Sequence, residues 1–188
     1  MTSFKKHGLR GSALEEMINR TLEIYRANHL ALVQKIPTPI TPITINKETR
    51  HITLAYFDQA STVDYVGVVQ GIPVCFDAKE CAKDTFPLQN LHEHQVRFMT
   101  DFEQQGGIAF LVLAFTTREE YYYMPYREMM EFWNRMKLGG RKSFTITELD
   151  PQYFMDVTPD LILPILKGIQ KDLDQRGDNH EKSVNSYT

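Results

Sequence analysis

The chain has 188 residues, 42% of them hydrophobic and 24% charged, which is enough for one hydrophobic core and one domain. Its formal net charge is −3, so it lacks the overall basic character usual for a DNA-binding protein. No run approaches the ~18–20 apolar residues of a membrane span, and the polar start lacks a signal-peptide core, so we expect a cytoplasmic protein without membrane contact.

The first predicted elements are a leader and a helix. Residues 1–12 form a basic leader that we expect to be flexible, and the first fifty residues are more basic than the rest. Ser12-Ala13-Leu14-Glu15 has capping-box spacing, in which the Ser12 hydroxyl accepts from the Glu15 amide and the Glu15 carboxylate returns to Ser12. Apolar residues at helical spacing follow, so the pattern predicts an amphipathic helix over 13–26.

A short strand, 31–35, leads into an unusual segment. Three prolines between positions 37 and 42 exclude helix and leave few donors for a sheet ladder. Two β-prone runs, 43–45 and 52–57, then flank a polar stretch. We predict that residues 36–60 form an arm that projects from the body. From composition alone, a surface hairpin without function is an equally good interpretation.

The remaining elements predict a mixed sheet with helices. Val63 to Val69 and Ile72 to Ala78 flank Gln70-Gly71 and indicate a β-hairpin. The continuous apolar run 108–115 predicts a central strand covered on both faces. Further expected elements are a loop over 85–90, a helix over 92–105, a strand over 121–124, a helix over 125–136, a loop over 138–143, a helix over 159–173 and a disordered polar tail over 174–188. This order predicts an α/β domain.

Aromatic and sulfur-containing residues have ordinary structural interpretations. Strand alternation predicts that Tyr122 is buried while its tyrosine neighbours are exposed, and Trp133 is expected in the core. Cys75 lies within a predicted strand and Cys81 beyond it, so we expect a packing residue and a loop residue, both reduced.

The predicted hairpin brings acidic residues together. If Gln70-Gly71 is a two-residue turn, Asp64 lies opposite Asp77 and Thr62 lies opposite Lys79. All four side chains then emerge on one face of the hairpin. Two opposed carboxylates repel each other, and a divalent cation between them converts that repulsion into ligation. The residues therefore predict a Mg²⁺ site, which Mn²⁺ can also fill.

Such a site suits phosphodiester hydrolysis. A bound cation polarises phosphate oxygens and activates water, while Lys79 neutralises the charge that develops. A structural role stays open, because an Asp-x-Lys tripeptide is most often a solvated strand end. The register is also open, since Pro73 could force a bulge that separates Asp64 from Asp77.

These residues resemble a known family. Asp64 followed by Asp77-Ala78-Lys79 has the form of the PD-(D/E)xK nuclease signature. Several longer segments are similar to bacterial RecU resolvases, over most of the chain from about Arg10 to about Leu166: Lys35-Ile36-Pro37-Thr38-Pro39-Ile40, Ala55-Tyr56-Phe57, Ser61-Thr62-Val63-Asp64-Tyr65-Val66-Gly67-Val68, Phe76-Asp77-Ala78-Lys79-Glu80, Phe86-Pro87-Leu88-Gln89-Asn90-Leu91-His92-Glu93-His94-Gln95 and Gln105-Gly106-Gly107-Ile108. The segment from Phe86 to Gln95 is the most specific of them.

The resemblance implies a restriction-endonuclease-like α/β fold. It implies a single nuclease domain over 13–173, with the arm 36–60 as a stalk that enters the centre of a four-way junction. It also implies a homodimer that contacts the strand-exchange recombinase and the branch-migration machinery. Two active sites about a two-fold axis can nick two strands symmetrically. The family's metal-binding positions correspond to Thr62, Asp64, Asp77 and Gln95, and its transition-state stabiliser to Lys79.

Other residues are weaker candidates, and one departs from the family. Asp77 stands where the family more commonly has glutamate, and the basic leader is short. Glu15 could supply a third acid, although the capping box already explains it. His92 and His94 lie on different sides of a helix, which disfavours zinc. Arg10, Lys35, Lys47, Arg50 and His92 are the candidates for DNA contacts.

Three functions are therefore weighed. The leading one is symmetric, metal-dependent nicking of Holliday junctions in recombination and repair. The second is a restriction-type or general DNA endonuclease on the same fold. The third is a junction-binding recombination modulator without cleavage, against which the intact Asp64, Asp77 and Lys79 argue.

Overall fold

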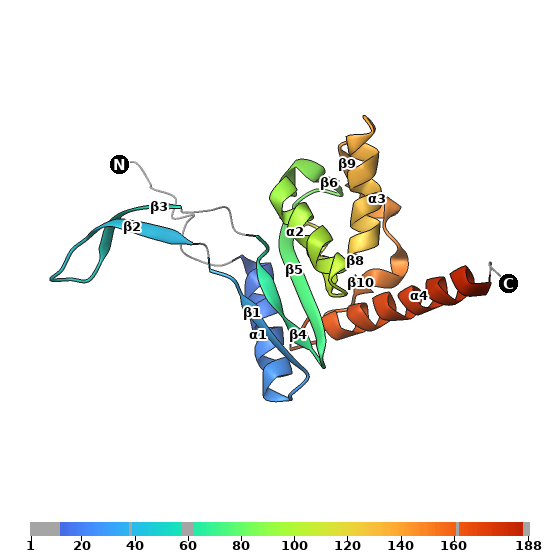
Figure 1. Cartoon of the computed structure of the whole chain (residues 1–188), viewed down its shortest axis with the longest axis horizontal. Coiled ribbons are helices and arrows are strands. Elements are labelled where there is room, and N and C mark those ends of the chain that lie inside the picture. The colour runs from blue at the N-terminus through green and yellow to red at the C-terminus, as the bar shows by residue number, and fades with distance from the viewer. Residues whose placement is uncertain (1–11, 38, 58–61, 161, 186–188) are drawn as a thin grey trace.

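A six-stranded mixed sheet forms the centre of the computed structural model (Figure 1). The structure describes residues 12–37, 39–57, 62–160 and 162–185, with side chains described up to 177. Only β5 and β7 are parallel, and every other neighbouring pair in the sheet is antiparallel. In sheet order the strands are β1 (Ala31–Lys35), β4 (Tyr65–Val69), β5 (Ile72–Cys81), β7 (Ile108–Phe115), β8 (Glu120–Pro125) and β10 (Phe154–Met155).

Helices cover both faces of this sheet. On one face, α1 (Ala13–Ala27) and α4 (Ile165–Asn185) pack over Phe76 and Phe110. On the other face lie α2 (Glu93–Gln104) and α3 (Tyr126–Lys137), which are joined by a hydrogen bond from Tyr126 to Thr100 (3.0 Å). The predicted α/β architecture, a mixed sheet flanked by helices with a protruding arm, is confirmed.

The core lies along β5 and β7. All eight residues of β7 are buried, as the apolar run predicted for a strand covered on both sides. On the α1–α4 face the rings of Tyr65, Phe76, Phe110 and Tyr123 stack in a row across four strands. This row of rings fixes the strands relative to one another. The positions of Asp64, just before β4, and of Asp77, on β5, therefore follow from core packing.

The arm is a separate two-stranded sheet. Strands β2 (Ile40–Ile45) and β3 (Ile52–Phe57) pair only with each other among the described residues, and they extend away from the body (Figure 1). The register shifts near Pro42 and Thr44, where proline cannot donate to the ladder. Six large apolar side chains on the arm are exposed: Ile40, Ile43, Ile45, Ile52, Leu54 and Tyr56. The arm is held by its own pairing and has no core.

Several sequence predictions are wrong in detail. The expected loop at 85–90 contains β6 (Thr85–Pro87), which pairs with β9 (Ser143–Thr145), and the short helix η1 (Leu88–Asn90). Cys81 is the buried last residue of β5 and not a loop residue. Tyr123 is as buried as Tyr122, because helices cover both faces of β8. Trp133 is in the core, as predicted.

The C-terminal helix also differs from its prediction. It begins at Ile165, after Pro164, and not near Pro159. It continues to Asn185, so the tail predicted to be disordered from 174 is helical up to that residue. The carboxylate of Asp172 holds this helix against α3 by an ion pair with Arg127. The predicted leader lies almost entirely outside the described residues.

Among the described residues, none of the helices combines the length and the hydrophobicity that a membrane-spanning segment requires.

Candidate active site

The site is built on the hairpin between β4 and β5. Gln70 and Gly71 both have positive φ values, 47° and 90°, which is the conformation of a tight two-residue turn whose twist matches the strands. The register runs from Val69 opposite Ile72 to Tyr65 opposite Phe76, as the sequence predicted. Pro73 pairs with Val68 in this regular register.

The two acidic residues lie next to each other where the ladder ends. The backbone N–H of Asp64 donates to Oδ1 of Asp77 (3.0 Å), and the N–H of Ala78 donates to Oδ2 of Asp64 (3.0 Å). Each carboxylate thus accepts a backbone amide from the opposite strand. The predicted pairing of Asp64 with Asp77 is confirmed, although Asp64 directly precedes Tyr65, the first residue of β4.

Asp77 is a buried acid surrounded by donors. Its side chain is 0% exposed, and its Oδ2 lies 2.5 Å from Nζ of Lys79, which is itself 18% exposed. Burial raises the pKa of Asp77 to about 7; the ammonium of Lys79 opposes this shift, and the nearby carboxylate of Asp64 adds to it. Burial therefore disfavours the ionised form of Asp77, and nearby positive charge stabilises it.

Gln95 reaches Asp77 from the first turn of α2. Its Nε2 donates to both carboxylate oxygens of Asp77 (3.0 Å each), and its Oε1 accepts the backbone N–H of His92 (3.2 Å). Because that N–H can only donate and the carboxylate accepts, the two partners fix the orientation of the amide. The spacing of His92 and Gln95 is that of a capping box, a sequence signal that could have revealed the bond to His92.

The other predicted site residues are more scattered. Thr62 is exposed and precedes β4. The Ser12 hydroxyl accepts a hydrogen bond from the Glu15 N–H as predicted, but the predicted return of the Glu15 carboxylate to Ser12 is wrong: that carboxylate forms an ion pair with Lys35 (2.7 Å). Glu15, the possible third acid, and Lys35, a candidate DNA contact, are therefore paired with each other in this structure.

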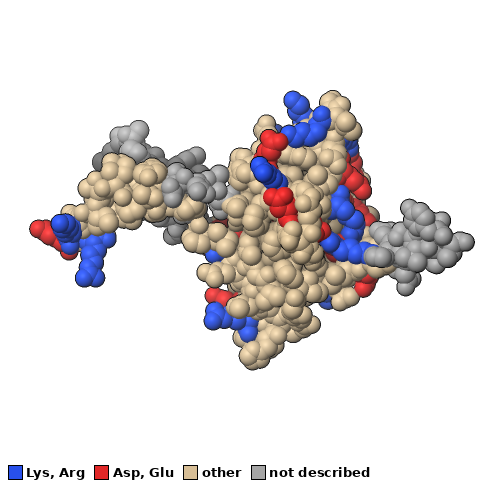
Figure 2. Space-filling model, in the orientation of Figure 1, with Lys and Arg blue, Asp and Glu red and all other residues tan. Residues whose placement is uncertain are grey.

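The remaining candidate DNA contacts lie far apart. Lys47 and Arg50 are in the turn at the tip of the arm, where charged side chains gather (Figure 2). His92 is exposed and stacks on His94, with ring centroids 5.4 Å apart, so the prediction that they lie on different sides of a helix is wrong; His92 precedes the helix as its N-cap. Arg10 lies outside the described residues.

The donor set fits a hard divalent cation in part. Asp64 and Asp77 supply carboxylate oxygens, the ligands that Mg²⁺ and Mn²⁺ prefer. The oxygen of Gln95 is directed at His92, so Gln95 serves Asp77 as a donor in this arrangement. No group of three or more His, Cys, Asp or Glu side chains within the described residues could hold a metal. A cation here would complete its shell with water and phosphate oxygens.

Sequence reasoning missed Glu80. Its carboxylate accepts the backbone N–H of Leu14 (2.9 Å), one of the free donors in the first turn of α1. Lys79 and Glu80 point to opposite faces of β5. Lys79 therefore contacts Asp77, while Glu80 contacts the start of α1. No local signal reveals this contact, because it joins residues 66 positions apart.

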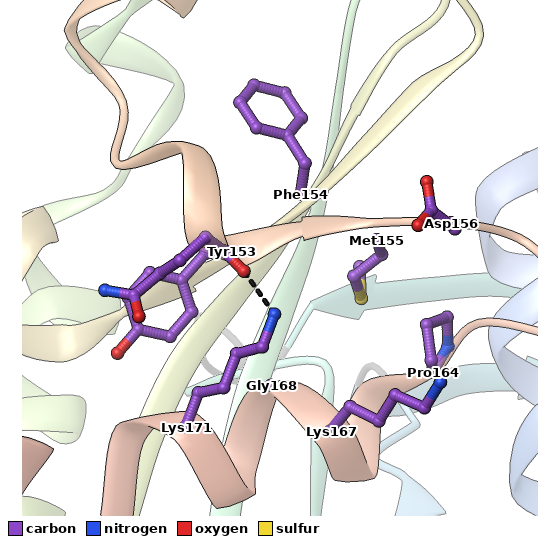
Figure 3. Close-up of a pocket in the computed structure, with 9 residues that line it drawn as sticks. Tyr153, Phe154, Met155, Asp156, Pro164, Lys167, Gly168 and Lys171 are labelled. Atoms are coloured by element: carbon purple, nitrogen blue, oxygen red, sulfur yellow. Dashed lines mark hydrogen bonds between the residues drawn. The ribbon is translucent and has the colours of Figure 1, made fainter. Parts of the chain in front are cut away.

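A separate pocket between β10 and α4 contains none of the predicted site residues. It is lined by residues of the 152–156 segment and of α4 (Figure 3). Lys171 donates to the carbonyl of Gln152 across it, so part of its polar surface is already used.

Comparison with known proteins identifies the family. The family model described as "Recombination protein U", RecU, matches residues 9–171. The chain belongs to the RecU family. It is similar to the Holliday junction resolvase RecU of Oenococcus oeni, at 46% identity over 142 residues, covering 73% of this chain and 72% of that protein.

A second RecU relative covers more of the chain. The Holliday junction resolvase RecU of Leuconostoc mesenteroides is 43% identical over 163 residues, covering 85% of this chain and 78% of the relative. Among solved structures, the Holliday junction resolvase Hjc of Archaeoglobus fulgidus aligns over 62% of this chain and 78% of its own, with a TM-score of 0.39 and 13% identity. The family model and the RecU relatives cover both the acidic hairpin and α2.

Proposed function

We propose that this RecU-family chain is a Holliday junction resolvase, an endodeoxyribonuclease that nicks four-way junctions symmetrically in recombination and repair. The observation that carries the proposal is the contact of Asp64 with Asp77, beside Lys79, at the end of the hairpin. Its relatives from Oenococcus oeni and Leuconostoc mesenteroides bear the name Holliday junction resolvase.

Each residue of the site has a role in phosphodiester hydrolysis. When bound, Mg²⁺ supplies charge neutralisation at the phosphate and a water of lowered pKa. Asp64 and Asp77 would hold this cation, and the N–H donors of Gln95 and Asp64 orient the carboxylate of Asp77. Where Asp64 and Asp77 hold a cation, Lys79 would be free to leave Asp77 and donate to a non-bridging phosphate oxygen. In the net reaction water adds to phosphorus and gives up a proton, one P–O ester bond breaks, and the sugar oxygen that leaves takes up a proton.

The arm and the oligomer complete the proposal. The exposed apolar side chains of β2 and β3 suit the open centre of a four-way junction, where bases are unstacked. Lys47 and Arg50 at the tip would contact phosphates there. A homodimer would place two sites about a two-fold axis for symmetric nicking. The strand-exchange recombinase and the branch-migration machinery would be its partners in the cytoplasm.

A comparison of DNA substrates tests this function. The protein is incubated with a labelled four-way junction and with a linear duplex of the same sequence, in Mg²⁺, in Mn²⁺ and in EDTA. We expect paired nicks in the junction with either cation, little cutting of the duplex, and none in EDTA. Equal cutting of the duplex would support a general or restriction-type endonuclease. Binding without cutting would support a non-cleaving modulator.

Two variants separate binding from chemistry. Lys79→Ala and Asp77→Asn should bind the junction and lose at least about 10²-fold in nicking rate, because each removes a charge at the reacting phosphate or its cation. Lys83→Ala, which removes an exposed lysine four residues further along, is the matched control and should cut normally. Full activity of Lys79→Ala would exclude the role given to Lys79.

A further inference from the structure

The loop between α3 and β9 presents an unusual combination of side chains. Lys137 at the end of α3 and Arg141 and Lys142 in the loop are exposed cations, and Leu138 between them is 89% exposed. Leu138 is more exposed than any of the large apolar residues of the arm. A lone exposed leucine is ordinary, but this one is the C-cap of α3 and stands among basic residues.

The shape of this loop is fixed by its own backbone. Gly139 has a φ of +87°, a conformation that other residues rarely adopt. A Cβ on Gly140 would lie 2.7 Å from the carbonyl oxygen of Arg135, so glycine is required there as well. The carbonyl of Lys142 accepts the N–H of Leu88 (3.0 Å), which anchors the base of the loop to the segment that leads into α2. The backbone that carries the cations is therefore fixed before any partner binds.

The loop lies near the acidic site, on the same face of the sheet. Lys137, the last residue of α3, forms an ion pair (2.9 Å) with Glu93, the first residue of α2. Two residues further on, Gln95 contacts Asp77. The arm leaves from the opposite side, after β1 ends at Lys35 (Figure 1). The acids thus lie between the arm and the loop.

Positive charge exceeds negative charge around the loop. Glu93 pairs with Lys137, and Glu148 pairs with both Arg135 and Arg141. In the part of the chain that the structure describes, no carboxylate forms a salt bridge with Lys142. Basic side chains are visible at the end of the molecule where α3 and β9 meet (Figure 2). A positive surface on a chain of net charge −3 indicates an anionic partner.

We propose that the loop 137–142 is a second DNA contact, which holds the phosphate backbone of a duplex arm while its scissile phosphate lies at Asp77 and Lys79. This inference rests on the proposed function and adds a binding surface to it. Arg141 and Lys142 contact phosphates, and Leu138 lies in the minor groove, where apolar side chains can wedge between base steps. The loop and the arm together grip the junction on both sides of the acids.

The dependence of junction binding on salt tests this surface. The double variant Arg141→Gln with Lys142→Gln is compared with the wild type by fluorescence anisotropy in EDTA, over a series of salt concentrations. Removing one cation that neutralises a phosphate should reduce the slope of log K against log salt by about 0.9, so the expected change for two is roughly 2. Leu138→Ser should weaken binding at every salt concentration and leave the slope unchanged. Thermal melting checks that each variant folds.

Matched and single variants keep the test decisive. Arg26→Gln with Lys167→Gln removes two exposed cations from α1 and α4, on the opposite face, and should keep the wild-type slope. Lys142→Gln alone breaks no ion pair of the described residues and should show about half of the effect. A wild-type slope in the Arg141–Lys142 variant, or an equal change in the control, would overturn the inference. Because the assay measures binding only, it stays informative if the wild type fails to cut junctions, a result that would reject the proposed function instead.

Discussion

The carboxylate of Asp77 combines features that oppose each other. It is fully buried, which disfavours its charge, yet it accepts bonds from Lys79, from Gln95 and from the amide of Asp64. The pKa of Asp77 is raised to about 7, with burial as the largest cause. Near neutral pH the group therefore changes charge readily, and a bound cation would keep it ionised.

This pKa predicts a pH-dependent stability. Between pH ~4 and ~7 the folded chain holds a proton on Asp77 that the unfolded chain releases, so this group lowers stability as pH rises through that window. Asp77→Asn has no such proton. We expect the melting temperature of Asp77→Asn, relative to that of the wild type in EDTA, to increase from pH 4 to pH 7.5 and then level off.

Asp101→Asn, which removes an exposed carboxylate on α2, is the matched control for that experiment. Added Mg²⁺ should raise the melting temperature of the wild type at pH 8 more than that of Asp77→Asn, because ligand binding stabilises the folded state. A difference between Asp77→Asn and the wild type that stays constant with pH would contradict the raised pKa.

The alternation of side chains along the two strands of the hairpin was sufficient to predict from the sequence that Asp64 and Asp77 meet. Two features of the site could not be predicted from the sequence. The orientation of Gln95 depends on how α2 docks on β5, and the complete burial of Asp77 depends on the helices that cover that face. Both are tertiary contacts between distant segments, for which a local pattern contains no signal.

Among the elements, β5 joins the site to the first helix. Glu80 caps the start of α1 through the N–H of Leu14, while Lys79 faces the acids. Glu80→Ala leaves a free N–H in the first turn and should cost about 1 kcal/mol, which lowers the melting temperature by roughly 2–4 °C in a domain of this size. Glu23→Ala, on an exposed position of α1, is the control and should change it by less. No difference between the two variants would exclude a capping role.

Element boundaries were predicted best where periodicity was strong. The strand at 31–35 has the predicted bounds, and the helices starting at Ala13 and Glu93 lie within one residue of theirs. The short strands β6 and β9 were missed because three residues carry no periodic pattern, and their pairing joins segments far apart in the chain. The length of α4 was missed because its polar second half resembles a disordered tail.

The whole molecule consists of a packed body and an arm without a core. Since β2 and β3 pair only with each other in the described part of the chain, replacing residues 40–57 by a short Gly-Ser linker should leave the melting temperature within a few degrees of the wild type. The preference for a four-way junction over a linear duplex should disappear. Calorimetry and competition binding measure the two effects. A variant that keeps its preference would place junction recognition in the body.

The turn at Gln70-Gly71 has a consequence for how this protein can vary. One extra residue there would exchange the two faces of β4 relative to β5, so Asp64 would point into the row of stacked rings and Tyr65 toward Asp77 and Lys79. The chemistry can thus be abolished by an insertion far from any catalytic group. Among natural variants that still cut DNA, we expect the length of this turn to be constant, while the tip of the arm tolerates insertions.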